Sequence, residues 1–416
     1  MSLAFSERVR VALAPPRYLA FPFAGIDIST SGVKAVRLAE DSRGLTLASY
    51  AETLLPLGVF TDGEAVDRAA VVGAIAETAK KAGISAANAT LSESKSYLFE
   101  TAADGGGKAE RRIALEQHLD ELVPLPPSDV AFDFVGIGQD ARGAARVSGI
   151  GFARRIIDDT LSLFDEAGVI VRSLEGETFA MARALLPRGD ASTALIIDVG
   201  RMTTKVAIVT DRIPRFATTI GIGGHAFTLA VQKHFGVTET EARKVKAEHG
   251  IVPAPGSEDY LAAMLSTVSA IRDEISGRLD YWQERAATEG AHPPVSRAVL
   301  AGGNASIRGL PEYLEGALRI PVVAGDVFTN LASRDCWIPD IDYTASLAYA
   351  TAIGLALRDV AEPLLRLTLS LTFFRANAAT RSRATTSCAS APSPYYSRPR
   401  SSSRPRYCSR RPTSSS

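Results

Sequence analysis

The chain has 416 residues, of which 46% are hydrophobic, and its 46 Lys and Arg balance its 46 Asp and Glu, so the formal net charge is zero. This hydrophobic content excludes a chain that remains disordered, and the length is sufficient for two or three domains. The balanced charge argues against a strongly basic protein, so we expect no nucleic-acid partner.

The balance conceals two segments of different chemistry. From Pro363 to Ser416 there are ten Arg but no Lys and no acidic residue, whereas the first 362 residues carry a net charge of −10. We interpret this Arg/Ser tail as the product of a change in reading frame, with a disordered basic arm or a weak membrane anchor as alternatives. The body has a single cysteine and no apolar run of 18 residues, which favours a reducing, cytoplasmic location.

The first informative segment follows a leader at 1–20. An apolar run at 24–28 contains Asp27, a polar turn follows at 29–32, and the run at 33–38 alternates apolar and polar residues. This pattern predicts two strands joined by a tight turn. A third strand is expected at 45–50 and a helix at 67–82, ended by Gly83.

The middle of the chain has a different pattern. Leu115, Leu119 and Leu122 have helical spacing and are followed by Pro124, which predicts a short helix. The segments that follow are expected to be strands at 130–137 and 145–152, a helix at 156–167, a strand at 169–174 and a helix at 178–186.

The opening pattern then recurs 171 residues further on. An apolar run at 194–200 contains Asp198, a turn follows at 201–204, and a second apolar run covers 205–209. In both copies a lysine, Lys34 or Lys205, stands seven residues after the aspartate. The recurrence indicates an internal duplication. The last expected elements are a long helix at 261–282, a strand at 298–303, a helix at 311–317 and a closing helix at 343–357.

Three glycine- or serine-rich turns after predicted strands are candidates for phosphate binding, because such turns expose backbone N–H groups. They lie at 27–34, 198–204 and 302–304. Asp27 and Asp198, each at the end of a hairpin strand, are candidate Mg²⁺ contacts through water. The alternative is that each aspartate caps its turn and each glycine permits a positive φ.

These motifs together resemble those of the actin-like ATPase superfamily. Gly25–Lys34 and Asp198–Thr204 look like its two phosphate motifs, Leu300–Leu310 like its adenosine motif, and Glu177–Ala180 like its first connecting helix. The resemblance implies an α/β, two-lobed actin-like ATPase fold, made of duplicated ribonuclease-H-like domains with an inserted α+β subdomain.

The resemblance also implies a site for ATP and Mg²⁺. Asp198 and Glu177 would be the catalytic positions, with Glu177 placing the attacking water. The residues expected to bind the cofactor are Asp27, Ser29, Thr30, Ser31, Lys34, Gly200, Thr203, Gly223, Gly224, Lys246, Gly302, Gly303 and Asn304. Two departures, Ser29 in place of a glycine and Arg243 in place of an acid, point to a weak or absent ATPase.

Within the superfamily the chain resembles the PilM family of type IV pilus assembly. The resemblance rests on 116–125 with 132–134, on 223–228 with 241–246, and on 343–358. It implies a cytoplasmic adaptor at the inner face of the cytoplasmic membrane, which binds the N-terminal cytosolic peptide of a PilN-like partner and other pilus assembly proteins. An FtsA-like membrane-tethered filament protein and a small-molecule kinase remain alternatives, and self-association is left open.

The expected division of the chain follows from the motifs and the resemblance. After the leader, its parts are a first lobe core at 21–90 and 171–190, an inserted subdomain at 91–170, a second lobe core at 191–232 and 296–358, a helical subdomain of the second lobe at 233–295, and a disordered tail at 359–416.

Overall fold

The computed structural model describes residues 23–139, 143–253, 258–289, 293–358 and 360. The expected leader, and the expected tail apart from Val360, lie outside the described residues. Among the residues described, no helix has both the length and the apolar character needed to cross a membrane.

The first sheet is built around the first predicted hairpin. Its spatial order is β10-β6-β1-β2-β3; β1, β2 and β3 are antiparallel neighbours, while β6 and β10 run parallel to β1. Its strands are β1 (Phe23–Ser29), β2 (Gly32–Asp41), β3 (Gly44–Leu54), β6 (Ala86–Leu91) and β10 (Ile170–Gly176). The helices α2 (Arg68–Ala82) and α5 (Arg154–Glu166) pack on this sheet. A short hairpin, β4 (Phe60–Thr61) and β5 (Glu64–Ala65), follows β3.

The second sheet repeats this topology in the order β15-β14-β11-β12-β13, again with three antiparallel and two parallel strands. Its strands are β11 (Thr193–Val199), β12 (Thr204–Thr210), β13 (Ile213–Ile220), β14 (Arg297–Ala301) and β15 (Val322–Ala324). Asp198 pairs with Lys205 across β11 and β12, as Asp27 pairs with Lys34 across β1 and β2. The shared register confirms the predicted duplication.

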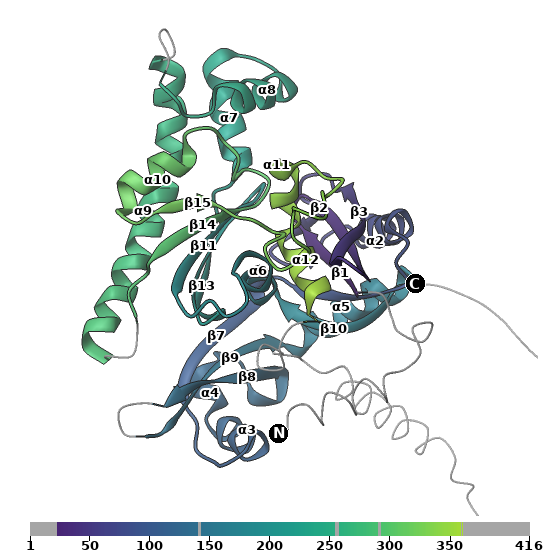
Figure 1. Cartoon of the computed structure of the whole chain (residues 1–416), viewed down its shortest axis with the longest axis vertical. Helices are drawn as coiled ribbons and strands as arrows, with labels where there is room; N and C mark the ends of the chain where they lie inside the picture. Colours follow the sequence, from purple (N-terminus) through teal and green to yellow (C-terminus); the bar gives the residue numbers. More distant parts are fainter. Residues whose placement is uncertain (1–22, 140–142, 254–257, 290–292, 359, 361–416) are drawn as a thin grey trace, which may run out of the picture. The chain divides into compact units, whose positions relative to one another are not determined.

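Two buried helices, α6 (Glu177–Leu185) and α12 (Ala350–Leu357), lie between the sheets (Figure 1). They approach closely because Gly354 has no side chain, and a Cβ there would overlap the Ala180 carbonyl oxygen. α12 also packs against β1, β2 and β6 of the first sheet, although the expected range 296–358 assigned it to the second lobe. The domain boundaries drawn from the sequence stay predictions.

The expected closing helix at 343–357 is interrupted. It consists of α11 (Tyr343–Ser346), a 3₁₀ turn (Leu347–Tyr349) and α12. The Leu347 carbonyl accepts a hydrogen bond from the Gly302 N–H at 3.0 Å. A regular helix would use that carbonyl for its own next turn, so the contact with the Gly302 loop explains the break.

The chain between β6 and α5 forms a module with its own small core. The strands β7 (Ser96–Ala102), β8 (Val130–Gln139) and β9 (Ala145–Ala153) form a sheet in the order β7-β9-β8. It carries the helices α3 (Lys108–Gln117) and α4 (Leu119–Leu122), and aromatic side chains such as Phe132 fill the core.

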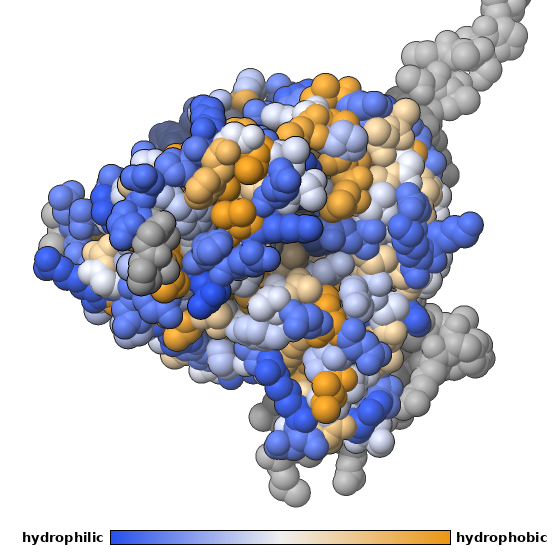
Figure 2. Space-filling model, turned by 90° about the horizontal axis from the view of Figure 1, so that it is seen from above, coloured by the Kyte–Doolittle hydropathy of each residue, from blue (hydrophilic) through white to orange (hydrophobic). Residues whose placement is uncertain are grey.

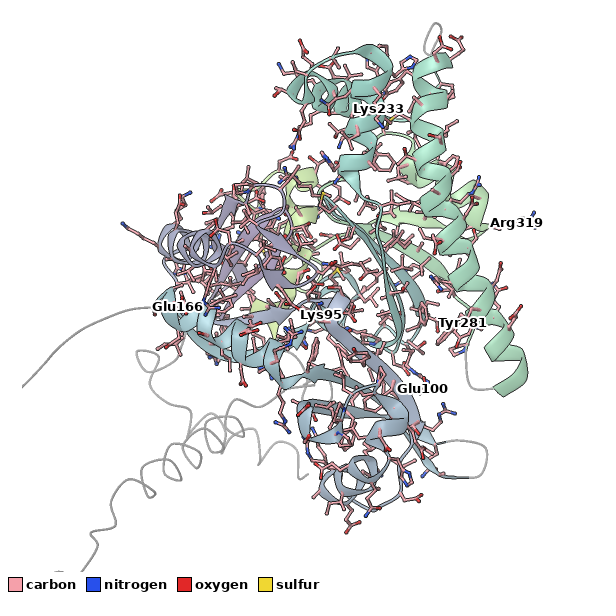
Figure 3. All side chains as sticks on the ribbon, turned by 180° about the vertical axis from the view of Figure 1, so that it is seen from behind. Lys95, Glu100, Glu166, Lys233, Tyr281 and Arg319 are labelled. Carbon is pink, nitrogen blue, oxygen red and sulfur yellow. The ribbon has the colours of Figure 1, made fainter. Side chains whose placement is uncertain are left out.

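This module is joined to β13 of the second sheet by a buried carboxylate. Glu100 on β7, labelled in Figure 3, accepts hydrogen bonds from Arg215 of β13 at 2.6 and 2.7 Å and from Arg146 of β9 at 2.7 Å. The Ser148 hydroxyl also donates to the Pro214 carbonyl at 2.8 Å. The module is therefore in direct contact with the second sheet.

The second half also contains four helices outside the sheet. They are α7 (Gly224–Phe235), α8 (Glu239–His249), α9 (Glu258–Glu289) and α10 (Leu310–Leu318). The long helix predicted at 261–282 is confirmed within α9, whose buried stripe includes Val268, Ile275 and Trp282. Thr238 and Glu241 form a capping box that fixes the start of α8.

Candidate functional site

A cleft of about 1540 Å³ lies between the two sheets, where the three predicted turns meet. Figure 2 shows the molecule from above, with a hollow that is bordered largely by hydrophilic residues. Of the residues predicted to form the site, those that line the cleft are Asp27, Ser29, Thr30, Ser31, Lys34, Glu177, Asp198, Gly200, Thr203, Gly224, Lys246, Gly302, Gly303 and Asn304. Gly223 is not among them; it packs against the backbone of Met202 and Thr203.

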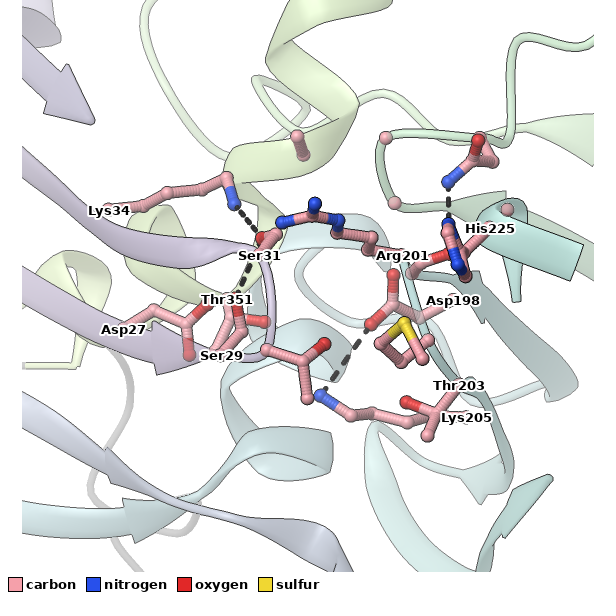
Figure 4. A pocket seen from close by; sticks show the side chains of 18 of the residues that line it. Asp27, Ser29, Ser31, Lys34, Asp198, Arg201, Thr203, Lys205, His225 and Thr351 are labelled. Atoms are coloured by element: carbon pink, nitrogen blue, oxygen red, sulfur yellow. Dashed lines mark hydrogen bonds and ion pairs between the residues drawn. The ribbon is translucent and has the colours of Figure 1, made fainter. Parts of the chain in front are cut away.

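The first hairpin contributes Asp27 and Lys34 (Figure 4). Asp27 is 7% exposed and accepts a hydrogen bond from the Thr90 hydroxyl at 3.0 Å. Burial raises the pKa of its carboxyl to about 6, and the charge of Glu177 adds to the rise. The Lys34 ammonium is directed to the Ser31 hydroxyl at 2.8 Å and to Glu52 at 3.1 Å.

Ser29 occupies a position where the resemblance predicts glycine. Its side chain makes its hydrogen bonds within the turn between β1 and β2. Its hydroxyl lies 2.9 Å from that of Ser31 and donates to the Gly32 carbonyl at 3.2 Å. The side chain therefore closes the turn between β1 and β2.

The second hairpin places a cation against two carboxylates. The Lys205 ammonium lies 2.7 Å from Glu177 Oε1 and 3.9 Å from Asp198 Oδ2. Burial raises the pKa of Asp198, and the charge of Lys205 offsets part of this rise. Burial alone would lower the pKa of Lys205, but Glu177, Asp198 and Asp27 together raise it above its ordinary value.

Glu177 is bonded at both carboxylate oxygens. Oε1 accepts from Lys205, and Oε2 accepts the backbone N–H of Glu93 at 3.0 Å. In return, Glu93 Oε2 accepts the N–H of Thr178 at 3.2 Å. These contacts fix the start of α6 and hold Glu177 in one position, 1% exposed.

The third turn joins the second hairpin to α7 and α8 through Asn304. Its side-chain amide donates to the Gly200 carbonyl at 2.9 Å, and its amide oxygen accepts from the Lys246 ammonium at 2.9 Å. Lys246 also donates to the Gly224 carbonyl at 3.2 Å. A Cβ on Gly224 would overlap the Asn304 side chain, so this junction requires glycine.

The pKa of Lys246 is lower than that of an ordinary lysine. Burial, together with the charge of Arg243, lowers its pKa from 10.5 to about 8. Between pH values of about 8 and 10.5, Lys246 is mostly neutral in the folded chain and protonated in the unfolded chain. The free energy of unfolding should therefore rise with pH over this range. A pH titration of the lysine side chains by NMR tests this. Arg243→Ala should move the Lys246 midpoint upward, and a wild-type midpoint at 10 or above would contradict the account.

The cleft also has features that suit a polar, anionic ligand. Lys34, Arg201, Lys205, Arg243 and Lys246 all line it. Two buried polar atoms of lining residues, Arg201 Nε and Thr219 Oγ1, have no hydrogen-bond partner among the described residues. Buried polar atoms are normally paired, so a bound ligand with acceptor oxygens fits this site.

The residues that line the cleft suit a bound Mg²⁺ ion less well than they suit an anionic ligand. No group of three or more His, Cys, Asp or Glu that could hold a metal ion occurs among the residues that the structure describes. Mg²⁺ keeps several waters and often needs only one or two carboxylates, so Asp27 and Asp198 remain eligible. The Lys205 ammonium, however, already lies beside Asp198.

Several residues that line the cleft, among them Lys205, Arg201 and Thr219, were not predicted as site residues. Lys205 had a visible signal, since it occupies the place of Lys34 in the repeated pattern. Arg201 lies within the predicted turn at 198–204 but was not named as a site residue. Thr219 had no local signal, because it reaches the cleft through the register of β13. The Arg201 side chain also crosses the cleft to donate to the Leu55 carbonyl at 3.0 Å.

Two sheets of the same topology, two buried helices between them and a polar cleft at the hairpin turns define the class: a two-lobed actin-like fold of the ATPase superfamily. Residues 25–360 match the family model described as type IV pilus assembly protein PilM. The chain belongs to the PilM family.

The chain is also similar to solved structures. A chain of a PilM-PilN type IV pilus biogenesis complex is 20% identical with a TM-score of 0.68, over 82% of this chain and 98% of that one. Ethanolamine utilization protein EutJ from Carboxydothermus hydrogenoformans is 15% identical (TM-score 0.45; 82% and 90% covered). MreB5 of Spiroplasma citri, solved with ADP, is also 15% identical (TM-score 0.48; 80% and 95% covered). Of these structures, only the PilM-PilN complex is similar enough to support the fold.

Proposed function

We propose that this chain is an ATP-binding adaptor of type IV pilus assembly. The observation that carries the proposal is the convergence of two matched hairpin turns and the Asn304 loop on one polar cleft, in a chain of the PilM family. Asp27, Lys34 and the 200–203 turn would face the phosphates. Lys246 and the Gly302–Asn304 loop would face the nucleoside. Mg²⁺, where it accompanies the nucleotide, would be reached through water by Asp27 and Asp198.

The nucleotide would act as a conformational ligand rather than as a substrate that turns over rapidly. Glu177, the residue expected to place the attacking water, is bonded at both oxygens, to Lys205 and to the Glu93 N–H. A carboxylate held in this way is poorly placed to orient water. Nucleotide binding would instead favour one arrangement of the two lobes over another.

The partner would be a PilN-like inner-membrane protein that presents an N-terminal cytosolic peptide. The solved relative named as a PilM-PilN complex supports this partner. Binding would bring the adaptor to the inner face of the cytoplasmic membrane, together with other pilus assembly proteins. A small-molecule kinase is less well supported, because it needs a free carboxylate base and both Asp198 and Glu177 lie against Lys205. The filament alternative rests on the tail, which lies outside the described residues.

A calorimetric titration with ATP tests the nucleotide site. The wild-type chain should bind ATP, and Gly224→Ala should weaken binding at least about tenfold, because the new Cβ displaces the Asn304 amide that positions Lys246. Gly316→Ala is the matched control: Gly316 is also a helical glycine, but nothing lies within 4 Å of the position of its Cβ. Absence of ATP binding by the wild-type chain would refute the proposal.

A further inference from the structure

The contacts of Lys205 distinguish the second hairpin from the first. Lys205 lies on β12 directly opposite Asp198, and its side chain is only 15% exposed. Its ammonium contacts Glu177 at 2.7 Å and lies 3.9 Å from Asp198 (Figure 4). The repeat of the hairpin has therefore placed a lysine inside the acidic part of the site.

The acidic part of the site needs a compensating positive charge. Asp27, Glu177 and Asp198 all line the cleft, and their exposed fractions are low. Buried carboxylates remain charged only where a cation or several donors compensate them. Lys34, the matching lysine of the first hairpin, contacts Ser31 and Glu52, and its charge lowers the pKa of Asp27 and Asp198 less than the charge of Lys205 does.

We propose that the Lys205 ammonium is the built-in cation of this nucleotide site and supplies charge that a divalent metal would otherwise bring, so that nucleotide affinity does not depend on Mg²⁺. This inference rests on the proposed nucleotide-binding function.

The chemistry of the two cations explains why one tends to replace the other. Mg²⁺ binds carboxylate oxygens and retains water in a strict octahedral geometry. A dication beside Asp198 would be repelled by an ammonium already within 4 Å of that carboxylate. The Lys205 ammonium is part of the chain, so it supplies positive charge without an ion from solution. Its three N–H donors can bond to carboxylate and phosphate oxygens at the same time.

The first test compares ATP binding by the full wild-type chain in excess EDTA and in excess Mg²⁺, using calorimetry. The expected result is a pair of dissociation constants that agree within about threefold. Binding that is more than about tenfold weaker in EDTA would overturn the inference and leave the proposed function intact. Absence of binding in both buffers would overturn the proposed function, and this inference with it.

Variants assign the effect to Lys205. Lys205→Gln should make the EDTA-to-Mg²⁺ ratio of dissociation constants at least about tenfold, while Lys205→Arg should keep it near one. Lys34→Gln is the matched control from the other hairpin, and it should weaken ATP binding in both buffers without changing the ratio. An unchanged ratio in folded Lys205→Gln would refute the role of Lys205. Should that variant fail to fold, the wild-type comparison decides alone.

Discussion

Arg183→Met should lower the free energy of unfolding by about 3–5 kcal/mol. Arg183 is 3% exposed and Glu175 is 1% exposed. Arg183 Nη1 donates to Glu175 Oε2 at 2.9 Å and to the Gly354 carbonyl at 2.8 Å, and Nη2 also bonds to Glu175. The pair ties β10, α6 and α12 together, so its loss leaves a buried carboxylate without its cation.

Urea denaturation of the purified chain measures this effect. The double variant Glu175→Met/Arg183→Met is the control, because it removes both charges and should regain most of the lost stability. A loss below about 1 kcal/mol for the single variant would show that water reaches Glu175, which contradicts the buried pair described here.

Gly302→Ala should abolish most nucleotide binding, lowering affinity at least about a hundredfold. Gly302 has a φ of 92°, a conformation that costs a residue with a Cβ about 1–3 kcal/mol. The added Cβ would also overlap the Asp198 carboxylate and lie 2.6 Å from the Val199 carbonyl oxygen. The substitution therefore disturbs both the Asp198 carboxylate in the cleft and the loop that breaks the closing helix.

The neighbouring glycine provides the control for folding. A Cβ on Gly303 would make only an ordinary contact, 3.8 Å from Ala348 Cβ. Gly303→Ala should therefore unfold thermally like the wild type, and Gly302→Ala should unfold at a lower temperature. Equal ATP affinity for Gly302→Ala and the wild-type chain would contradict the geometry of this loop.

The hairpins were the most predictable part of the fold because each is a local pattern. Alternating residues on either side of a polar turn determine the pairing of Asp27 with Lys34 without help from the rest of the chain. The strand β6 shows the limit of this reasoning. Its sequence, Ala-Ala-Asn-Ala-Thr-Leu, neither alternates nor favours strands. It is a strand because its two edges pair with β1 and β10 and all its residues are buried.

The site was predictable where it consists of turns and not where it depends on long-range contacts. The three turns were found from their glycines and aspartates, and the structure brings them to one cleft. The contact between Lys205 and Glu177 depends on how α6 approaches β12, and the Gly302–Leu347 hydrogen bond that breaks the closing helix depends on packing between distant segments. Neither leaves a local pattern in the sequence.

Nucleotide in the cleft should control binding of the pilus partner. The most direct test is the dissociation constant of the PilN-like partner's N-terminal cytosolic peptide, measured by calorimetry with and without saturating ATP. Peptide affinity should change at least about fivefold when ATP is bound, and ATP affinity should change by the same factor when the peptide is present. Peptide affinity that is the same with and without ATP would show that the nucleotide does not control the partner.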